Sequence, residues 1–231
     1  MIAFVDIQHP SIVDDPEQGP RHAALRQTLC QRIEQATGLP CRLVDHRRFS
    51  RAWADRAGVR AIMISGNSVD WDRYAPDAFA PLAEVMRDGG IPMLGFCGGH
   101  QLVAMLAGGD CGPIGPLPAG VPDPDPAWGA TMAARGMQRE VGVLPVVIER
   151  PDPLLANLPS PFLAWQSHYW EVKRLPPGFV VLAASAVCRV QVMRHLERPW
   201  FGTQFHPERY DEGYPAGAQL LRNFCRMHGL I

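Results

Sequence analysis

The sequence predicts an α/β fold with a central, mostly parallel β-sheet, and two observations lead to this class. Short β-branched or apolar runs alternate with stretches of helical period through the first half of the chain, as in the βαβ units of a parallel sheet. The chain has 231 residues, of which 47% are hydrophobic and 19% are charged, a composition that supports one well-buried core. We therefore expect a single domain over residues 1–231.

The first βαβ unit begins at the amino terminus. Strands are expected over residues 2–7 and 41–44, which are rich in apolar side chains. Between them, Leu25, Leu29 and Ile33 recur at the i, i+4, i+8 spacing of an amphipathic helix that ends at Gly38. Residues 61–65 are expected to form the third strand.

The following unit leads into a glycine-rich turn. A helix with apolar side chains from Phe79 to Met86 is expected to end at the glycine pair 89–90. The apolar run 91–96 then predicts a buried strand that continues directly into Cys97. Another helix should follow and end at the glycine pair 108–109.

The second half of the chain reads as a long loop followed by several strands and one helix. Residues 111–127 hold six prolines and three glycines, so we expect a loop at about 110–130 that serves as a lid or an interface. The expected strands are residues 141–148, 162–165, 180–184, 189–193 and 200–205, and a helix over 216–227 closes the domain.

The charged residues exclude several classes of function. The 22 Lys and Arg against 23 Asp and Glu give a net charge of −1, so the chain lacks the positive field that sequence-independent nucleic-acid binding needs. Lys173 is the only lysine, and it lies beside a turn. Neither a Walker A phosphate loop nor a lysine Schiff base is therefore expected.

The cysteines and the amino terminus indicate a cytoplasmic protein. The six cysteines contain no C-x-x-C pair, so free thiols are expected and no zinc ribbon. The amino terminus lacks the basic start of a signal peptide, and no apolar run of about 18 residues occurs. We expect no interaction with a membrane.

Cys97 is a candidate nucleophile. The heptapeptide Gly-Phe-Cys-Gly-Gly-His-Gln, residues 95–101, joins a predicted strand to a predicted helix, and its glycines permit the sharp turn that exposes nucleophiles in other enzymes. Unpaired N–H groups at the helix start favour the thiolate form of Cys97. From this segment alone, a buried core cysteine in a glycine-rich turn remains the alternative.

His206 and Glu208 are the second candidate pair. Both flank Pro207 in the segment Gln-Phe-His-Pro-Glu, residues 204–208, and extended backbone before the proline should direct both side chains to the same side. Glu208 could then orient the imidazole as a general base and acid towards Cys97. A metal site is less favoured, because His-x-Glu supplies two ligands and the sequence offers no evident third.

Together these two segments resemble those of the class I (triad) glutamine amidotransferases. The pattern Gly-x-Cys-x-Gly-x-Gln at 95–101 is followed about 110 residues later by Gln-Phe-His-Pro-Glu. The likeness extends to Ile-Ser-Gly-Asn at 64–67 and Arg-Glu-Val-Gly at 139–142. It also includes Trp-Gln-Ser-His at 165–168, which is similar to the Met-Ser-His segment of GMP synthetase amidotransferase domains. The resemblance implies a flavodoxin-like α/β sandwich and covers roughly residues 60–228.

The resemblance implies a role for each matched residue. Cys97 would attack the glutamine side-chain amide, His206 would protonate the leaving ammonia, and Glu208 would orient His206. The oxyanion of the thioester-forming step would be held by the backbone at Gly66, Asn67 and Gly98. The substrate pocket would include Gln101, Ser167, His168 and Tyr169. No cofactor and no metal is implied.

Two departures from the family pattern bear on these expectations. Asn67 stands where the family has a second glycine; because Asn tolerates positive φ, the loop can still form. Tyr169 and Trp170 follow the Ser-His pair where the family often has glycine, so they could narrow the pocket or face a partner.

Three functions are compatible with these residues. The favoured one is a glutaminase subunit that binds glutamine and supplies ammonia to a separate synthase, because 231 residues hold the amidotransferase domain and no further one. The alternative is a free-standing hydrolase or peptidase acting on a γ-glutamyl compound through the same Cys97, His206 and Glu208. The third is a silent regulatory protein of the same fold, against which the intact triad argues.

Overall fold

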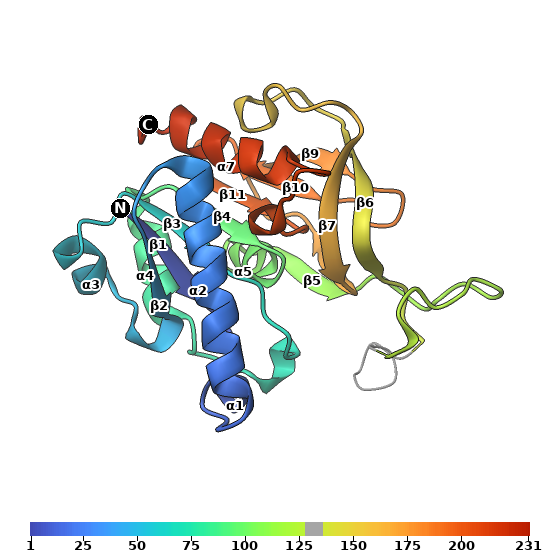
Figure 1. Ribbon diagram of the computed structural model, residues 1–231, viewed down its shortest axis with the longest axis horizontal. Coiled ribbons are helices and arrows are strands. Elements are labelled where there is room, and N and C mark those ends of the chain that lie inside the picture. The colour runs from blue at the N-terminus through green and yellow to red at the C-terminus, as the bar shows by residue number, and fades with distance from the viewer. Residues whose placement is uncertain (128–135) are drawn as a thin grey trace.

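The structure is a computed structural model that describes residues 1–127 and 136–231 (Figure 1). Its strands are β1 (Ile2–Asp6), β2 (Cys41–Asp45), β3 (Ala61–Ile64), β4 (Met93–Phe96), β5 (Asp110–Pro113), β6 (Glu140–Ile148), β7 (Phe162–His168), β8 (Trp170–Arg174), β9 (Phe179–Ala184), β10 (Val192–His195) and β11 (Trp200–Thr203). Its α-helices are α1 (Pro10–Val13), α2 (Gln18–Thr37), α3 (Arg51–Arg56), α4 (Ala80–Asp88), α5 (Gly98–Leu106) and α7 (Ala216–Met227).

One large mixed sheet organises the molecule. Within the described residues it has nine strands in the order β2-β1-β3-β4-β11-β10-β9-β6-β7, while β5 and β8 form a separate pair. The first five strands of that order run parallel. The remaining strands pair antiparallel as an extension on the β11 side. The predicted α/β class with a parallel sheet at its centre is confirmed.

Helices cover both faces of the parallel strands, which explains why those strands are apolar throughout. Side chains alternate between the faces along a strand, so Phe4 and Val5 of β1 enter different clusters. Phe4 belongs to the cluster that includes side chains of α2 and α7, whereas Val5 belongs to the cluster that includes side chains of α4 and α5. All five residues of β1 are buried.

The carboxyl ends of the parallel strands meet at one edge of the sheet. The ladder pairs Val5 with Ile64, Ile64 with Gly95, and Phe96 with Thr203. The residues that follow these positions in the chain therefore gather at the same edge, where ligand sites of open α/β sheets form.

Most predicted elements are present in the structure, but the sequence did not predict the short helices α1 and α3 or the strand β8, and other predictions differ in detail. Residues 111–113 are part of strand β5, which pairs with the unpredicted β8, so the long loop begins only after Pro113. The buried stripe of α2 passes through Arg26 and Leu29, whereas Leu25 is 42% exposed. The strand expected over 189–193 instead spans Val192–His195. At residues 111–113 the prolines and glycines suggested a loop although cross-strand pairing makes a strand.

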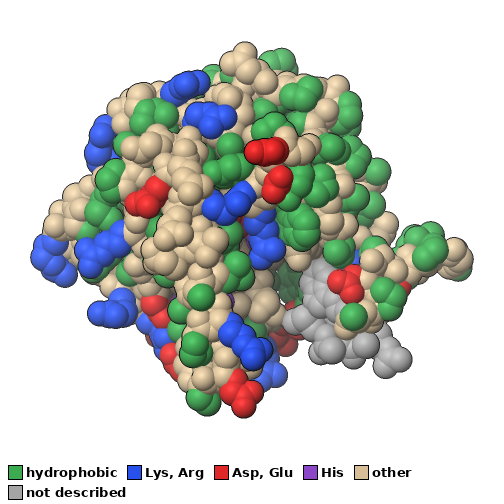
Figure 2. Space-filling view, viewed as in Figure 1, with side chains coloured by type: hydrophobic (Ala, Val, Ile, Leu, Met, Phe, Trp, Pro, Cys, Tyr) green, Lys and Arg blue, Asp and Glu red, His purple; other side chains and the backbone are tan. Residues whose placement is uncertain are grey.

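None of the helices in the described residues is both long enough and apolar enough to cross a membrane. On the face seen in Figure 2, the basic side chains are scattered and form no single patch, whereas hydrophobic side chains gather over the β6 and β7 end.

Candidate active site

Cys97 lies at the junction of β4 and α5, as the glycine pattern predicts. Its backbone adopts φ 50° and ψ −106°, a conformation that residues other than glycine rarely adopt. The N–H of Cys97 donates to the carbonyl of Thr203 at 2.8 Å, and its own carbonyl accepts from the N–H of Gln101 at 3.1 Å. A side chain at Gly95 or Gly99 would collide with neighbouring backbone. Close packing thus enforces the turn that presents the thiol.

The strained turn gives a stability prediction. Cys97→Gly should be more stable than Cys97→Ala by about 1 kcal/mol, because strained non-glycine backbone costs about 1–3 kcal/mol and glycine loses only about 0.5–1 kcal/mol through its unfolded-state entropy. Urea unfolding of the two variants measures the difference. Equal midpoints would mean that the conformation at position 97 carries no strain.

His206 and Glu208 form a buried ion pair. The Nδ1 atom of His206 lies 2.8 Å from Oε1 of Glu208, and Glu208 is fully buried. The short 3-10 turn Pro207–Arg209 brings the two side chains together, and the N–H of His206 donates to the carbonyl of Trp165 at 2.9 Å. Because Nδ1 faces the carboxylate, Nε2 of the same ring is directed away from Glu208.

The charges of this pair stabilise one another against burial. Burial alone would lower the pKa of His206, but the carboxylate of Glu208 and the sulfur of Cys97 raise it to about 9. Burial likewise acts to raise the pKa of Glu208, but the His206 charge and hydrogen bond hold it below its ordinary value. At neutral pH an imidazolium therefore faces a carboxylate.

Gly66, Asn67 and Gly98 surround Cys97. A Cβ atom placed on Gly66 would lie 3.0 Å from Cε1 of His206 and 3.3 Å from Cβ of Cys97, so Gly66 borders both side chains. A Cβ atom on Gly98 would lie 2.9 Å from the backbone nitrogen of Asn67 and would collide with its Oδ1. The two loops approach this closely because Gly66 and Gly98 lack side chains.

Asn67 does not use the tolerance for positive φ that the sequence suggested. Among the described non-glycine residues, only Cys97 and Asn157 have positive φ. The side-chain amide of Asn67 instead donates to the carbonyl of Val69 at 2.7 Å, which closes the loop locally.

Gln101 lies in the cavity wall with its amide engaged by the protein. Its Nε2 donates to the carbonyl of Trp170 and to Oε1 of Gln204, both at 3.1 Å, while its Oε1 accepts from Nε1 of Trp71 at 2.8 Å. Gln204 in turn places its Nε2 3.7 Å from Sγ of Cys97. A substrate that binds the side-chain amide of Gln101, as the sequence predicts, would therefore have to replace some of these three internal hydrogen bonds.

The β7–β8 turn supplies the opposite wall. The carbonyl oxygen of Ser167 lies 3.8 Å from Sγ of Cys97. The ring nitrogens of His168 lie 2.9 Å from the carbonyl of Trp170 and 3.0 Å from Oε2 of Glu140. The hydroxyl of Tyr169 donates to Asp70, so this bulky residue ties the β7–β8 turn to the loop after β3.

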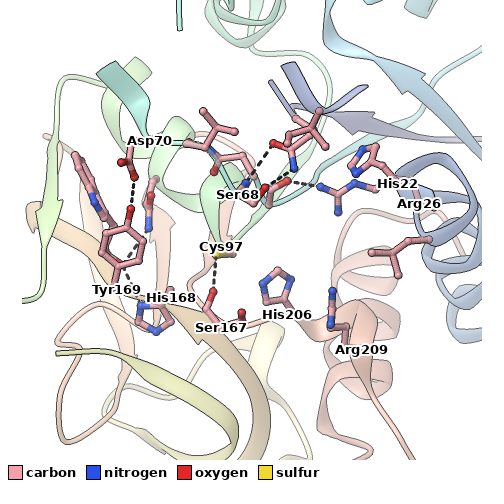
Figure 3. Close-up of a pocket in the computed structure, with 18 of the residues that line it drawn as sticks. His22, Arg26, Ser68, Asp70, Cys97, Ser167, His168, Tyr169, His206 and Arg209 are labelled. Carbon is pink, nitrogen blue, oxygen red and sulfur yellow. Dashed lines mark hydrogen bonds between the residues drawn. The ribbon is translucent and has the colours of Figure 1, made fainter. Parts of the chain in front are cut away.

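These walls enclose a cavity of about 640 Å³ that Cys97 and His206 both line. In Figure 3 they lie between Tyr169 and His168 on one side and His22, Arg26 and Arg209 on the other. The size falls within the range of small-molecule sites.

The Pro/Gly-rich loop borders this cavity. Asp125 contributes to the lining, and the carbonyl of Asp125 accepts from Nη2 of Arg139 at 2.8 Å. Arg139 also pairs with Asp123. Trp128 and Arg135, which the sequence suggests as further interface contacts, lie outside the described residues.

One group of potential metal ligands occurs in the part of the chain that the structure describes. Ligand atoms of Glu140, His168 and Cys188 lie within 4.8 Å of one another and are buried. The hydrogen bond from His168 and another from Nε2 of Gln191, at 2.6 Å, already engage Oε2 of Glu140. This cluster is separate from the His206 and Glu208 pair.

Two site features escape sequence reasoning. Gln204 stands inside the Gln-Phe-His-Pro-Glu segment, and its contact with Cys97 could have been suspected from that position. Asp6, at the carboxyl end of β1, binds His22 and Arg26 of α2 beside the cavity. His22 and Arg26 are four residues apart and therefore lie on the same face of the helix, which is the sequence feature that could have indicated a shared partner.

The fold and site define the class of protein. Residues 22–227 match the family model described as glutamine amidotransferase class-I, so the chain belongs to this family.

The relatives give a more particular comparison. The chain is 36% identical over 139 residues to a protein of Methanocaldococcus jannaschii that is named as one subunit of the glutamine-hydrolyzing GMP synthase. This match spans 60% of the present chain and 61% of that protein. The counterpart in Methanococcus maripaludis is 28% identical and matches over 86% of the present chain and 89% of its own.

Solved structures support the fold. A protein described as a GMP synthase subunit from Thermoplasma acidophilum has a TM-score of 0.70 at 23% identity, covering 99% of this chain and 94% of that one. A glutamine amidotransferase from Thermotoga maritima has a TM-score of 0.64 at 15% identity, covering 98% and 97%.

Proposed function

We propose that this protein is a glutamine-hydrolysing subunit that supplies ammonia to a separate synthase. The observation that carries the proposal is the grouping of Cys97, held in a strained turn, with the ion pair of His206 and Glu208 in one cavity. Activated thiol chemistry needs a nucleophile beside an oriented imidazole. Membership of the amidotransferase family supplies the amide substrate class.

The geometry supports a two-stage hydrolysis. Sγ of Cys97 adds to the side-chain carbonyl carbon of glutamine, and the N–H groups of Gly98 and Asn67 bind the resulting oxyanion. His206 donates a proton to the amide nitrogen as the C–N bond breaks, which releases ammonia and leaves a γ-glutamyl thioester. Water then gives up a proton to His206 and attacks the thioester, so that glutamate leaves and the thiol is restored.

The relatives indicate which partner to test first. Several are named as one subunit of a glutamine-hydrolyzing GMP synthase, although the matched segment spans only 61% of the Methanocaldococcus protein. We infer that the ammonia passes to the synthase component of an enzyme of this kind.

Glutamate and ammonia production from glutamine tests the proposal, measured with and without the GMP synthase partner subunit of the same organism. We expect turnover that rises when the partner and its substrates are present. A panel of γ-glutamyl amides serves as the comparison. Rapid turnover of one of these, with no turnover of glutamine in either condition, would contradict the proposal.

The His206 and Glu208 pair predicts the alkaline limit of activity. The pKa of His206 is about 9, so its proton-donating form predominates below that pH and is lost as the pH rises through it. We expect kcat/KM for glutamine to fall above about pH 9. In Glu208→Gln the carboxylate no longer offsets burial, so the fall should move to lower pH. Identical profiles for the two proteins would show that another group sets this limit.

A further inference from the structure

We propose that Arg26 is a positioning residue that fixes the oxyanion-binding peptide between Gly66 and Asn67. This inference rests on the proposed function. It concerns a side chain on α2, outside both motifs that carry the candidate nucleophile and its imidazole. Figure 3 shows Arg26 beside His22 on the side of the cavity away from Tyr169.

Two hydrogen bonds hold the carbonyl oxygen of Gly66. Nη2 of Arg26 donates to it at 2.5 Å, and the hydroxyl of Ser65 donates to it at 2.9 Å. A peptide unit is planar and trans, so its C=O and N–H groups point in opposite directions. Fixing the Gly66 carbonyl towards α2 therefore directs the N–H of Asn67 away from α2. That nitrogen is the one against which Gly98 packs beside Cys97.

Asp6 anchors the guanidinium. Nε of Arg26 donates to Oδ1 of Asp6 at 3.0 Å, and Nε2 of His22 lies 2.6 Å from Oδ2 of the same carboxylate. Burial acts to raise the pKa of Asp6, but its partners His22 and Arg26 hold it below the ordinary value. Asp6 therefore stays ionised at neutral pH and keeps Arg26 in one orientation.

The position of Arg26 in α2 argues for a dedicated role. It is only 6% exposed, and it stands in the buried stripe that continues through Leu29 and Ile33. A buried guanidinium costs free energy unless its donors are satisfied, and here they span a carboxylate and a loop carbonyl. An apolar residue would suit the core at this point, but it would leave the Gly66 carbonyl to Ser65 alone.

Arg26→Lys tests the proposal because lysine keeps the charge but cannot reach Asp6 and Gly66 together through a planar fork. We expect kcat for glutamine to fall by about 10- to 100-fold, below the effect of removing an oxyanion donor outright, while KM changes by less than about threefold. Alkylation of Cys97 by iodoacetamide, which forms no oxyanion at a carbonyl, should keep the wild-type rate. Arg60→Lys is the matched control, since Arg60 also donates to a backbone carbonyl, that of Gly229.

A second variant guards against a simple folding defect. Arg26→Ala with added methylguanidinium at millimolar concentration should regain part of the lost kcat, whereas Arg60→Ala should not respond. Unchanged kcat in both Arg26 variants, or a matching loss of the Cys97 alkylation rate, would overturn the positioning role while wild-type turnover persists. Absence of glutamine turnover in the wild-type protein with its partner would instead contradict the proposed function itself.

Discussion

Replacing Cys97 with alanine is expected to lower glutamine hydrolysis by at least about 10⁴-fold, to the background rate. The sulfur is the atom that would form the thioester, and no other described thiol lines the cavity. Burial also raises the pKa of the nearby Cys111 thiol to about 12, so it cannot substitute. The measurement is glutamate release with the partner subunit present.

Binding and stability should survive this change. Cys97 is small, and alanine keeps its Cβ, so urea unfolding and partner binding should remain close to wild type. Cys41→Ala is the matched control, because Cys41 lies on β2, away from the cavity, and should retain full turnover. Appreciable hydrolysis by Cys97→Ala would eliminate the thioester mechanism.

Structural features that depend on residues close together in the chain could be predicted from the sequence. The glycines that permit the turn at Cys97 lie within two residues of it, and the contact of His206 with Glu208 spans a single proline. The helix from Ala216 to Met227 was also predicted with its observed limits. Such features depend on steric rules that act between near neighbours in the chain.

Features that depend on distant partners were not predictable from one sequence. Arg26 reaches Gly66 across 40 positions, and without that partner the helix pattern favoured Leu25 as the buried residue. The same applies to the pairing of β5 with β8, because composition alone made residues 111–113 resemble a loop. In both cases contacts between distant parts of the chain determine which residues are buried or paired, because they outweigh the local helix or strand propensity.

The roles of Tyr169 and Gln101 show the same limit within the site. The sequence suggested that Tyr169 narrows the pocket, but its hydrogen bond to Asp70 depends on a loop 99 positions away. Likewise, the internal partners of Gln101 come from three separate segments. The residues of the cavity wall were thus identifiable, whereas their hydrogen bonds required the structure.

His206→Ala and Glu208→Ala should separate proton transfer from orientation. Loss of the imidazole removes both the proton donor and the charge beside Cys97, so kcat/KM for glutamine should fall by about 10³- to 10⁴-fold. The Glu208 carboxylate acts on the reaction through its hydrogen bond to Nδ1 of the ring, so its removal should lower kcat/KM about ten times less than removal of the imidazole. Both activities are compared with wild type at one pH below 7, where the alkaline limit of the wild-type protein does not interfere.

The comparison of the two variants also depends on whether the buried His206 ring keeps its proton when Glu208 is removed. Without Glu208, burial favours neutral His206, which still reaches Cys97 through Nε2 and can serve as a base. The Glu208→Ala enzyme should therefore lose more of the ammonia-releasing step, which needs a proton donor, than of thioester hydrolysis, which needs a base. Single-turnover measurement of ammonia and glutamate release distinguishes the two steps. If Glu208→Ala were as inactive as His206→Ala in both, the carboxylate would do more than orient and charge the ring.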